Sequence, residues 1–572
     1  MILQALVNYY EILRGEDKVP EAGYSIAKVS YGLNISCEGE LLNVIPLKRM
    51  AEVGKKKIEE PCLMKVPEQV TRSSGVSANF LCDNSSYLLG SDQKGKPKRS
   101  LECFEASKQL VTDVLNQCES SSARAVMNYF RKWNAEMVLG NPVLQDYIED
   151  LLAGGNIVFF VEGEEVLKDR SIQSAWEMYH SGDKDENQMQ CLITGKYAAI
   201  ARLHPVIRGI PGAQSSGASL VSFNAVAYDS YGHENGTNAP ASKEAVFAYT
   251  TVLNYLLSKR DHKQTVGDMT VVFWADSLKS EYCDAFSAGI GGDEDKQELI
   301  KRIFEKISIG QPVEDIDMGT EFYILGLSPN AARLSVRFFI KNSFGKILEN
   351  LYRHQERLKI IKPLSKFENI PLYWLLRETV NLNSKDKSPT PLMAGAMLRA
   401  IIQGTPYPNS FYQGLILRAK AERNVTSGRA AGIKAYLMHN KDYQVNQEVL
   451  KVKVNEETNE KAYVLGRLFA VLERAQEEAN KNINSTIKDK YFTSACANPG
   501  VVFPRLLQLA GYHNAKNEYG KAREYEIGKI ISKLDVENEP FPSHLSLKEQ
   551  GIFMLGYYQQ REQRFEKKED KQ

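Results

Sequence analysis

The chain has 572 residues, of which 43% are hydrophobic and 25% are charged, so it can build several domains with sizeable cores. We expect about three or four domains from this length. The net charge is only +1 at pH 7, whereas a free-standing nucleic-acid binder is usually strongly basic. Any role on nucleic acid must therefore rest on local basic patches or on a place inside a larger assembly.

The cysteine pattern and the hydropathy exclude other classes of protein. Eight cysteines are scattered along the chain without a C-x-x-C pair, which argues against a zinc site and a disulfide framework and fits a reducing compartment. No apolar run reaches the length of about 18 residues that a membrane span needs. The N-terminal segment lacks the basic region and cleavage site of a signal peptide. We expect a cytoplasmic protein without a membrane partner.

The first part of the chain alternates helical and strand patterns. Apolar residues at helical spacing predict a helix over residues 1–15, and two strand-like runs around a polar turn predict a hairpin over 24–47. The elements expected next are a helical stretch at 102–153, a strand at 156–161, a helix at 243–258, a buried strand at 269–275, a polar and acidic surface segment at 283–315, and two strands around the turn Ser328-Pro329-Asn330 at 321–340. This interleaving predicts a mixed α+β fold up to about residue 340.

The strand signal disappears from residue 343 onward. Helices are expected at 343–361, 370–381, 390–403, 408–422 and 429–437 and, after a polar connector at 440–460, at 462–479, 484–497, 501–513, 517–534 and 546–562. The last group is expected to form a helical bundle. The fold class is thus α+β with an all-α C-terminal part. The expected regions are an N-terminal region with the hairpin and basic loops at 1–120, a mixed central region at 121–342, a helical region at 343–437 and the bundle at 438–572.

Residues 195–255 are unusually rich in glycine, serine and asparagine for the interior of a folded domain. Gly209 and Gly212 allow sharp turns, so the backbone can approach another polymer closely and offer N–H groups to phosphate. The candidates for nucleic-acid or subunit contact are Lys196, Arg202, Arg208, Gln214, Ser215, Ser216, Gly217, Asn224 and Asn238. The three basic residues precede the glycines at intervals suited to lining one surface. The alternative is a long structural loop between a strand and the helix at 243–258, with Ser242 as the N-cap.

A second stretch rich in serine, asparagine and glycine covers residues 61–90 and runs into a basic segment. Residues 41–100 contain 11 Lys and Arg against 6 Asp and Glu, and side chains suited to base edges and phosphates lie within this excess. The candidates for DNA binding are Arg72, Ser73, Ser74 and Asn79 and, in a basic loop expected to be flexible, Lys94, Lys96, Lys98 and Arg99. The alternatives are a solvated charged face and, for Asn79, the start of a strand.

No catalytic set is recognisable in the sequence. It contains no Walker A motif, no G-x-G-x-x-G after a strand, no G-x-S-x-G and no H-E-x-x-H. We therefore expect a protein that is not an enzyme and has no catalytic residue, metal site or other cofactor. The alternative is a metal-dependent nuclease or nucleotidyl transferase in which Asp229, His233 and Glu234 bind the metal ion.

Several long segments resemble one family in the same order along the chain. They are MILQALVNYY, SGVSANFLCDNSSYLLG followed by GKPKR, GAQSSGASLVSFNAVAYDSYGHENGTNAP, GDMTVVFWAD and AYVLGRLFAVLERAQEEANKNINSTIKDKYF. Together they are similar to the large subunit of the type I-C CRISPR Cascade, an RNA-guided surveillance complex. The similarity touches the start, the middle and the end of the chain.

The resemblance implies a non-catalytic subunit that recognises the PAM, the short duplex motif beside the target, aids DNA unwinding and stabilises the R-loop. The implied partners are the CRISPR RNA, target double-stranded DNA with its PAM, the backbone and handle-binding subunits of Cascade, a small subunit from the same gene, and the helicase-nuclease that cuts the DNA. Residues 70–84 would read the PAM, and residues 94–99 would hold phosphates. The small subunit would arise by internal translation from Met438, which we prefer to Met393 and Met397 because it leaves the bundle intact.

Overall fold

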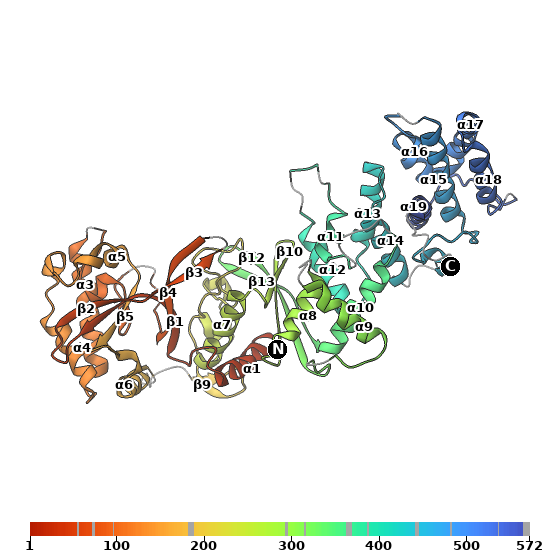
Figure 1. Ribbon diagram of the computed structural model, residues 1–572. Coiled ribbons are helices and arrows are strands. Elements are labelled where there is room, and N and C mark those ends of the chain that lie inside the picture. The colour runs from red at the N-terminus through yellow and green to blue at the C-terminus, as the bar shows by residue number, and fades with distance from the viewer. Residues whose placement is uncertain are drawn as a thin grey trace. The chain divides into compact units, whose positions relative to one another are not determined.

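The structure, a computed structural model, divides into two compact units (Figure 1). It describes residues 1–53, 56–70, 72, 75–94, 96–180, 188–291, 296–313, 316–361, 369–381, 383–385, 388–440, 445–480, 483–535 and 537–563, with only the backbone at 51–53 and 56–58. Unit 1 comprises Met1–Val206 and Val221–Tyr255, and unit 2 comprises Ile207–Leu220 and Leu256–Gln572. Sheets lie in the N-terminal and central parts and only helices follow, which confirms the expected α+β fold class.

Unit 1 is built on a sheet that is seven-stranded in the described residues, with the order β3-β4-β1-β6-β5, β2 paired to β1 and β7 paired to β6. The strands are β1 (Tyr24–Ile35), β2 (Leu41–Pro46), β3 (Lys48–Val53), β4 (Lys56–Pro67), β5 (Cys82–Asp83), β6 (Asn156–Val161) and β7 (Glu164–Glu165). The antiparallel pairing of β1 with β2 confirms the predicted hairpin. β6 coincides with the predicted strand and pairs in parallel with β1. The pattern of the sequence did not indicate β3 and β4. A separate pair, β8 (Gln188–Gln190) and β9 (Tyr197–Ala199), completes the strands of unit 1.

The helices of unit 1 include the predicted ones, in a divided form at 102–153, and two that were not predicted, α2 and α6. The helices are α1 (Ile2–Gly15), α2 (Ser85–Leu88), α3 (Pro97–Leu115), α4 (Ser121–Lys132), α5 (Ile148–Ala153), α6 (Arg170–His180) and α7 (Lys243–Ser258), whose last three residues belong to unit 2. Short 3-10 turns separate α4 from α5, so the stretch at 102–153 is not one continuous helix. Tyr129 and Phe130 of α4 pack against Phe159 of β6, with ring centroids 5.1 and 5.7 Å apart. Ser242 caps α7 as predicted, because its Oγ accepts a hydrogen bond from the Ala245 N–H at 3.2 Å.

Unit 2 begins with a four-stranded antiparallel sheet in the order β10-β11-β12-β13. The strands are β10 (Lys263–Val266), β11 (Met269–Ala275), β12 (Glu321–Asn330) and β13 (Arg333–Ser343). β11 is buried throughout its length, as predicted. The expected turn at Ser328-Pro329-Asn330 is wrong, because these residues continue β12 and the chain reverses at Ala331 and Ala332. Ala331 takes a positive φ of 53°, a conformation that the sequence does not suggest for alanine.

The segment at 283–315 differs from its predicted character. It contains α8 (Glu281–Ile290) and α9 (Gln297–Ser308). α8 is mostly buried, with Tyr282, Cys283 and Phe286 in the core of unit 2. The expectation of a surface segment is therefore wrong for α8. Its acidic residues lie in the first turn, where they favour the helix N-terminus, and its apolar residues face the sheet.

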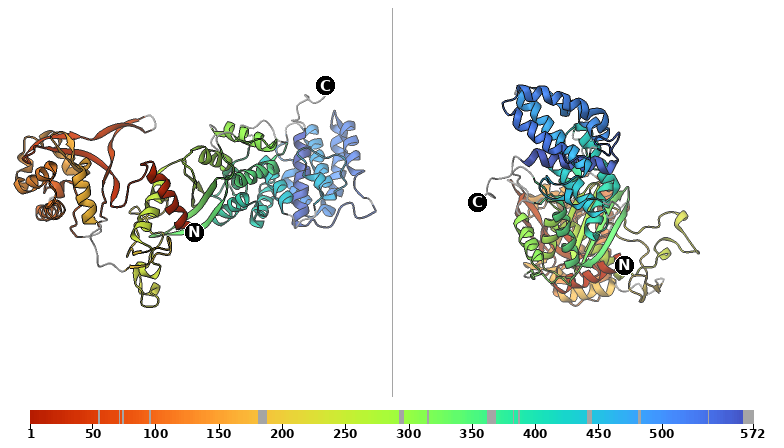
Figure 2. Two further views of the ribbon diagram at one scale, coloured as in Figure 1. Left: turned by 90° about the horizontal axis from the view of Figure 1, so that it is seen from below. Right: turned by 90° about the vertical axis from the view of Figure 1, so that its right-hand side faces the viewer.

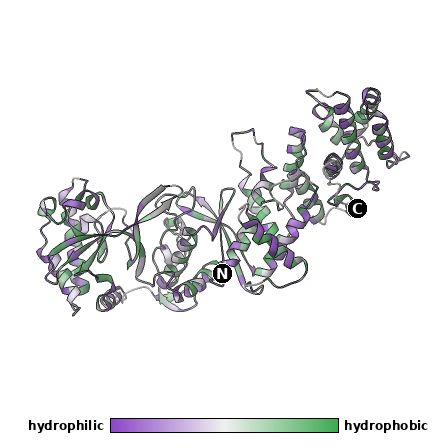
Figure 3. Cartoon of the chain, viewed as in Figure 1, coloured by the Kyte–Doolittle hydropathy of each residue, from purple (hydrophilic) through white to green (hydrophobic). Residues whose placement is uncertain are grey.

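The remainder of unit 2 is helical. The helices are α10 (Phe344–Leu358), α11 (Leu372–Arg377), α12 (Pro391–Gln403), α13 (Asn409–Glu422), α14 (Ser427–His439), α15 (Lys461–Ala479), α16 (Ile487–Ala497), α17 (Pro499–Lys516), α18 (Gly520–Ile531) and α19 (Leu547–Glu562). Each lies close to its predicted position. α15 to α19 pack side by side as a bundle (Figure 2), and their ribbons carry both apolar and polar residues (Figure 3). One hydrophobic core runs from Val266 to Tyr558.

In the described ranges, no helix combines the length and hydropathy that a membrane crossing requires.

Candidate nucleic-acid interface

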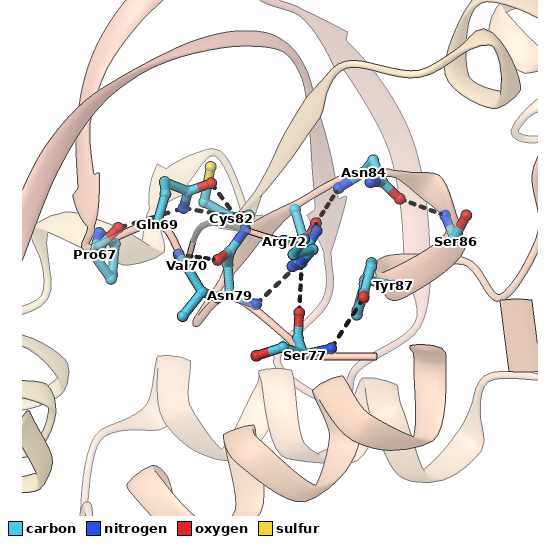
Figure 4. A network of polar contacts seen from close by, with 11 residues as sticks. Pro67, Gln69, Val70, Arg72, Ser77, Asn79, Cys82, Asn84, Ser86 and Tyr87 are labelled. Carbon is cyan, nitrogen blue, oxygen red and sulfur yellow. Dashed lines mark hydrogen bonds and ion pairs between the residues drawn. The ribbon is translucent and has the colours of Figure 1, made fainter. Parts of the chain in front are cut away.

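A buried carboxylate, Asp83, organises the segment that carries the first group of candidate residues. Figure 4 shows the network of polar contacts in which Arg72, Asn79 and Asn84 take part. Asp83 ends β5, and its side chain is only 1% exposed. Arg72 binds it with both terminal nitrogens: Nη1 donates to Oδ1 at 2.9 Å, and Nη2 donates to Oδ2. The guanidinium carbon of Arg72 also lies 3.9 Å from the centre of the Tyr87 ring. This bidentate ion pair against an aromatic face is a geometry that arginine provides and lysine does not.

Backbone groups satisfy the rest of the Asp83 carboxylate. The N–H groups of Asn79 and Asn84 donate to Oδ2 and Oδ1 at 2.9 and 2.8 Å. Arg72 Nε donates to the Ser77 carbonyl at 2.6 Å. Because each of these bonds joins the carboxylate or its cation to the surrounding backbone, the Arg72–Asp83 pair fixes the shape of residues 77–84.

Asn79 is also engaged inside the protein. Its side chain is buried, its Oδ1 accepts from the Val70 N–H at 2.8 Å, and its Nδ2 donates to Gln69 Oε1 at 2.9 Å. Gln69 in turn donates to the Cys82 carbonyl at 3.1 Å. The structure thus brings the predicted residues Arg72 and Asn79 together, but both side chains bind protein groups. Ser73 and Ser74, the two other candidates of this segment, lie outside the described residues.

The second group, Lys94, Lys96, Lys98 and Arg99, is exposed. The expected flexible loop is wrong for Lys98 and Arg99, because α3 begins at Pro97, a residue favoured at the start of a helix. Arg99 Nη2 donates to the Gly75 carbonyl at 3.1 Å, so this helix start adjoins the segment held by Asp83. The free N–H groups at the N-terminus of α3 add positive potential to that of the side chains. The surface formed by these residues therefore attracts anions.

The glycine-rich stretch at 195–255 is shared between the two units. Lys196 and Arg202 are exposed in unit 1, whereas Arg208 is exposed in unit 2. The sequence predicts that these three residues line one surface. Because they belong to different units, this stays a prediction.

Residues 207–218 form a closed loop in unit 2. Ile207 and Ala218 exchange backbone hydrogen bonds of 2.8 and 2.9 Å, which join the two ends of the loop. Ser219 bonds to the backbone of Ala332 and Leu334, so the loop is fixed at the turn between β12 and β13. The predicted contact residues Gln214, Ser215 and Ser216 are exposed on this loop, whereas Gly217 is buried and has a positive φ of 108°.

Asn224 and Asn238, the last two candidates, lie in unit 1. Asn224 is exposed. Asn238 binds its own loop: Oδ1 accepts from the Ser230 N–H at 2.9 Å, and Nδ2 donates to the Asn235 carbonyl at 3.1 Å. Asn238 therefore holds the turn at residues 230–233 in place.

The residues proposed for a metal site do not form one. In the part of the chain that the structure describes, no group of three His, Cys, Asp or Glu side chains could hold a metal ion, and Asp229, His233 and Glu234 are included in that statement. The half-buried His204 shares a hydrogen bond of 2.6 Å with the Tyr249 hydroxyl, and desolvation lowers the pKa of His204 to about 4. A neutral histidine bound to a buried tyrosine fits a structural role.

Two residues that stand out in the structure are absent from the sequence prediction. Asp83 is the only acidic residue of the segment FLCDNSS, and a lone carboxylate among apolar residues near an arginine could have indicated a buried ion pair. Tyr231 lies in a turn with its side chain 98% exposed. The sequence does not indicate a tight turn at Tyr231, because Tyr-Gly is not one of the residue pairs that are typical of two-residue hairpin turns.

Comparison with known families identifies the class of this protein. Residues 6–565 match the family described as CRISPR-associated protein (Cas_Csd1), so the two units described above are those of a CRISPR-associated protein. The chain belongs to the Cas_Csd1 family, which confirms the resemblance found in the sequence. This membership supports the assignment of the chain as a subunit of the CRISPR Cascade complex. A comparison with curated proteins finds no match to the chain.

Proposed function

We propose that the chain is the non-catalytic large subunit of a type I-C CRISPR surveillance complex and recognises the PAM duplex through residues 70–99. Family membership over residues 6–565 supports its place in the complex. The observation that carries the DNA-binding role is the set of exposed cations at the start of α3, joined to the segment around Asp83 by the bond from Arg99 to Gly75.

The two groups of residues have different tasks in this proposal. Lys94, Lys96, Lys98 and Arg99 bind phosphates, which gives affinity without reading sequence. Ser73 and Ser74 contact base edges. The chain is anchored on both sides of these serines, at Arg72 through Asp83 and at Gly75 through Arg99. Arg72 and Asn79 then act by holding this segment, because a direct contact of Arg72 with DNA would leave the buried Asp83 carboxylate without its cation.

The further roles follow from the same place in the complex. The subunit aids DNA unwinding, stabilises the displaced strand of the R-loop, and recruits the helicase-nuclease. Its partners are the CRISPR RNA, the target DNA, the backbone and handle-binding subunits, and a small subunit from the same gene. The exposed backbone and side chains of residues 195–255 contact one of these partners.

Removal of the cations at the start of α3 tests the DNA-binding role. We expect that replacing Lys94, Lys96, Lys98 and Arg99 with alanine weakens binding to duplexes with and without a PAM, because phosphates are common to both. The slope of log affinity against log salt should fall by about 0.9 for each phosphate that the variant no longer neutralises. Binding is measured by fluorescence anisotropy with the full chain at several salt concentrations.

The matched control removes two cations that are already neutralised. Lys346 and Arg353 on α10 both pair with Glu349, at 2.8 Å for Lys346. Their replacement with alanine should leave the salt slope unchanged. An unchanged slope in the α3 variant would contradict the proposed binding of phosphates.

A further inference from the structure

Tyr231 occupies an unusual turn in unit 1. The His233 N–H donates to the Ser230 carbonyl at 3.0 Å, and these two residues form an antiparallel bridge. Between them, Tyr231 and Gly232 have consecutive positive φ values of 54° and 76°. These features define a type I′ turn, in which asparagine or aspartate is the usual first central residue. A tyrosine is strained there because its Cβ crowds the backbone.

The surrounding loop holds this turn firmly. Asn238 accepts from the Ser230 N–H on one side of the turn and donates to the Asn235 carbonyl on the other. Gly236 packs so tightly that a Cβ there would lie 2.1 Å from the Ala201 carbonyl oxygen. The strained conformation thus persists because several independent contacts determine it, which is typical of backbone that serves a function.

No packing inside the protein accounts for the tyrosine ring, because the side chain is 98% exposed. Two neighbours on the same segment are also exposed, Val226 at 85% and Tyr228 at 45%. An aromatic side chain presented on a rigid turn loses little conformational entropy on binding, and tyrosine is enriched among the residues that dominate protein interfaces. These observations indicate a docking surface.

The charge of the segment selects the kind of partner. Residues 209–242 contain no lysine or arginine, and their only charged residues are Asp229 and Glu234, both of which are exposed. These two carboxylates flank the turn at residues 230–233, and a segment of this kind, without a cation of its own, repels the phosphates of RNA and DNA. It is complementary to a protein surface with a basic rim around an apolar recess.

We infer that the turn at residues 230–233 docks a neighbouring protein subunit of the complex, with Tyr231 filling an apolar recess that basic side chains surround. This inference rests on the proposed function, because it requires the chain to be a subunit of that complex. It assigns the exposed part of residues 221–238 to subunit contact rather than to nucleic acid. Asn238 is a positioning residue that acts through the turn.

The affinity of the full chain for the rest of the complex tests the docking role. The probe is the complex of CRISPR RNA and the other subunits, purified without this chain. Tyr231→Ala should raise the dissociation constant by about 30-fold, the effect of a dominant interface residue. Tyr231→Phe should bind like the original chain because the ring is kept. Tyr525→Ala, which removes a tyrosine of unit 2 that is 77% exposed, is the control and should also bind normally.

Tyr231→Asn separates docking from folding. Asparagine suits the first central position of a type I′ turn, so this variant should unfold at a temperature no lower than that of the original chain. It should nevertheless lose affinity to the same extent as Tyr231→Ala. Normal affinity of Tyr231→Asn or Tyr231→Ala would overturn the inference.

A photo-crosslinking amino acid in place of Tyr231 identifies the class of partner. In the assembled complex it should join the chain to another protein subunit. A crosslink to RNA or DNA, or no crosslink in a complex that has assembled, would overturn the inference. Binding of the isolated Tyr231 variants to a PAM duplex should be normal, so a failure here and a failure of the α3 cation experiment are distinguishable.

Discussion

The side chain that determines the proposed DNA-contacting segment is Asp83 rather than the arginine beside it. A carboxylate that is 1% exposed needs a cation and hydrogen-bond donors, and Arg72, Asn79 and Asn84 supply them. The same bonds set the path of the backbone from residue 77 to residue 84. The polar residues of this segment therefore stabilise a shape, to which the exposed Arg99 is joined by its bond to the Gly75 carbonyl.

This interpretation predicts how the Arg72–Asp83 pair responds to substitution. Arg72→Ala leaves a buried carboxylate without a cation, which costs about 3–5 kcal/mol. The Asn79 and Asn84 amides, which donate to Asp83, should then exchange with solvent faster by on the order of 100-fold or more. The double variant Arg72→Ala with Asp83→Asn removes the unpaired charge and keeps one acceptor oxygen, so much of the protection should return at the one amide that donates to this oxygen. Hydrogen exchange measured by mass spectrometry at these amides reports both effects.

PAM binding by the same two variants separates positioning from direct contact. If Arg72 acts by holding the segment, affinity for a PAM duplex falls in Arg72→Ala and recovers in part in the double variant. Equal loss in both variants would contradict the positioning role and indicate that the guanidinium itself contacts DNA. Asn79→Ala should weaken the same binding, because it removes the bonds to Val70 and Gln69.

The sequence provides the chemistry of these residues but not their pairing. Arginine, serine and asparagine near a basic excess are suitable for DNA, so Arg72 and Asn79 could be selected from composition. Their engagement with Asp83 and Gln69 depends on a turn in which Leu81, a fully buried residue, has a positive φ of 54°. No propensity rule assigns that conformation to leucine. The side chains that meet across the turn are therefore visible only in the structure.

At the scale of elements, the helices of this chain are better determined by sequence than the strands. The positions of α7 and of the helices from α10 to α19 agree closely with prediction. α10, for example, buries apolar residues at helical spacing along one face. The sequence pattern does not indicate β3 and β4 because charged residues interrupt the alternation of apolar and polar residues along both strands. α8 was misjudged because the acidic residues around it hide its buried face.

A change of glycine to alanine is expected to have opposite effects on the stability of the bundle at two positions, Gly466 and Gly528. A Cβ at Gly466 of α15 would lie 2.0 Å from the Phe553 carbonyl oxygen of α19, whereas a Cβ at Gly528 of α18 would meet nothing within 4 Å. Gly466→Ala should force the two helix backbones apart and destabilise the bundle by about 1–3 kcal/mol. Gly528→Ala should stabilise it by about 0.5–1 kcal/mol, because alanine favours a helix interior.

Thermal unfolding of the full chain, with hydrogen exchange in α15 and α19, measures both effects. The matched pair makes the same chemical change in two helices of one bundle. A rise in stability for Gly466→Ala similar to that for Gly528→Ala would show that close backbone approach does not hold these helices together.

At the scale of the whole molecule, the chain order of the elements could be predicted but the division into units could not. Residues 207–220 join unit 2 because Ser219 bonds to the turn between β12 and β13, which lies far along the chain. No local pattern encodes such a long-range pairing. The four regions expected from the sequence, with boundaries near residues 120, 342 and 437, stay a proposal about folding and gene organisation.

The internal start at Met438 is a prediction about how one gene yields two products. Met438 lies in the last turn of α14 and is 39% exposed, so a product that begins there contains α15 to α19 without the rest of α14. It would leave uncovered the side of α19 where Gly551 meets Tyr412 and Ile433 in the full chain. That exposed apolar side gives the short product a surface for joining the complex.

Mass spectrometry of the complex purified from its native operon should therefore detect a product of residues 438–572 beside the full chain. Met438→Leu, encoded by CUC, should abolish the short product, because this codon does not initiate translation. The fold of the full chain should change little, since a conservative substitution at a partly exposed position usually alters stability by less than about 0.5 kcal/mol. Met393→Leu and Met397→Leu, at buried positions of α12, serve as controls and should keep the short product. A short product that persists in Met438→Leu would place the start elsewhere and contradict the boundary at residue 438.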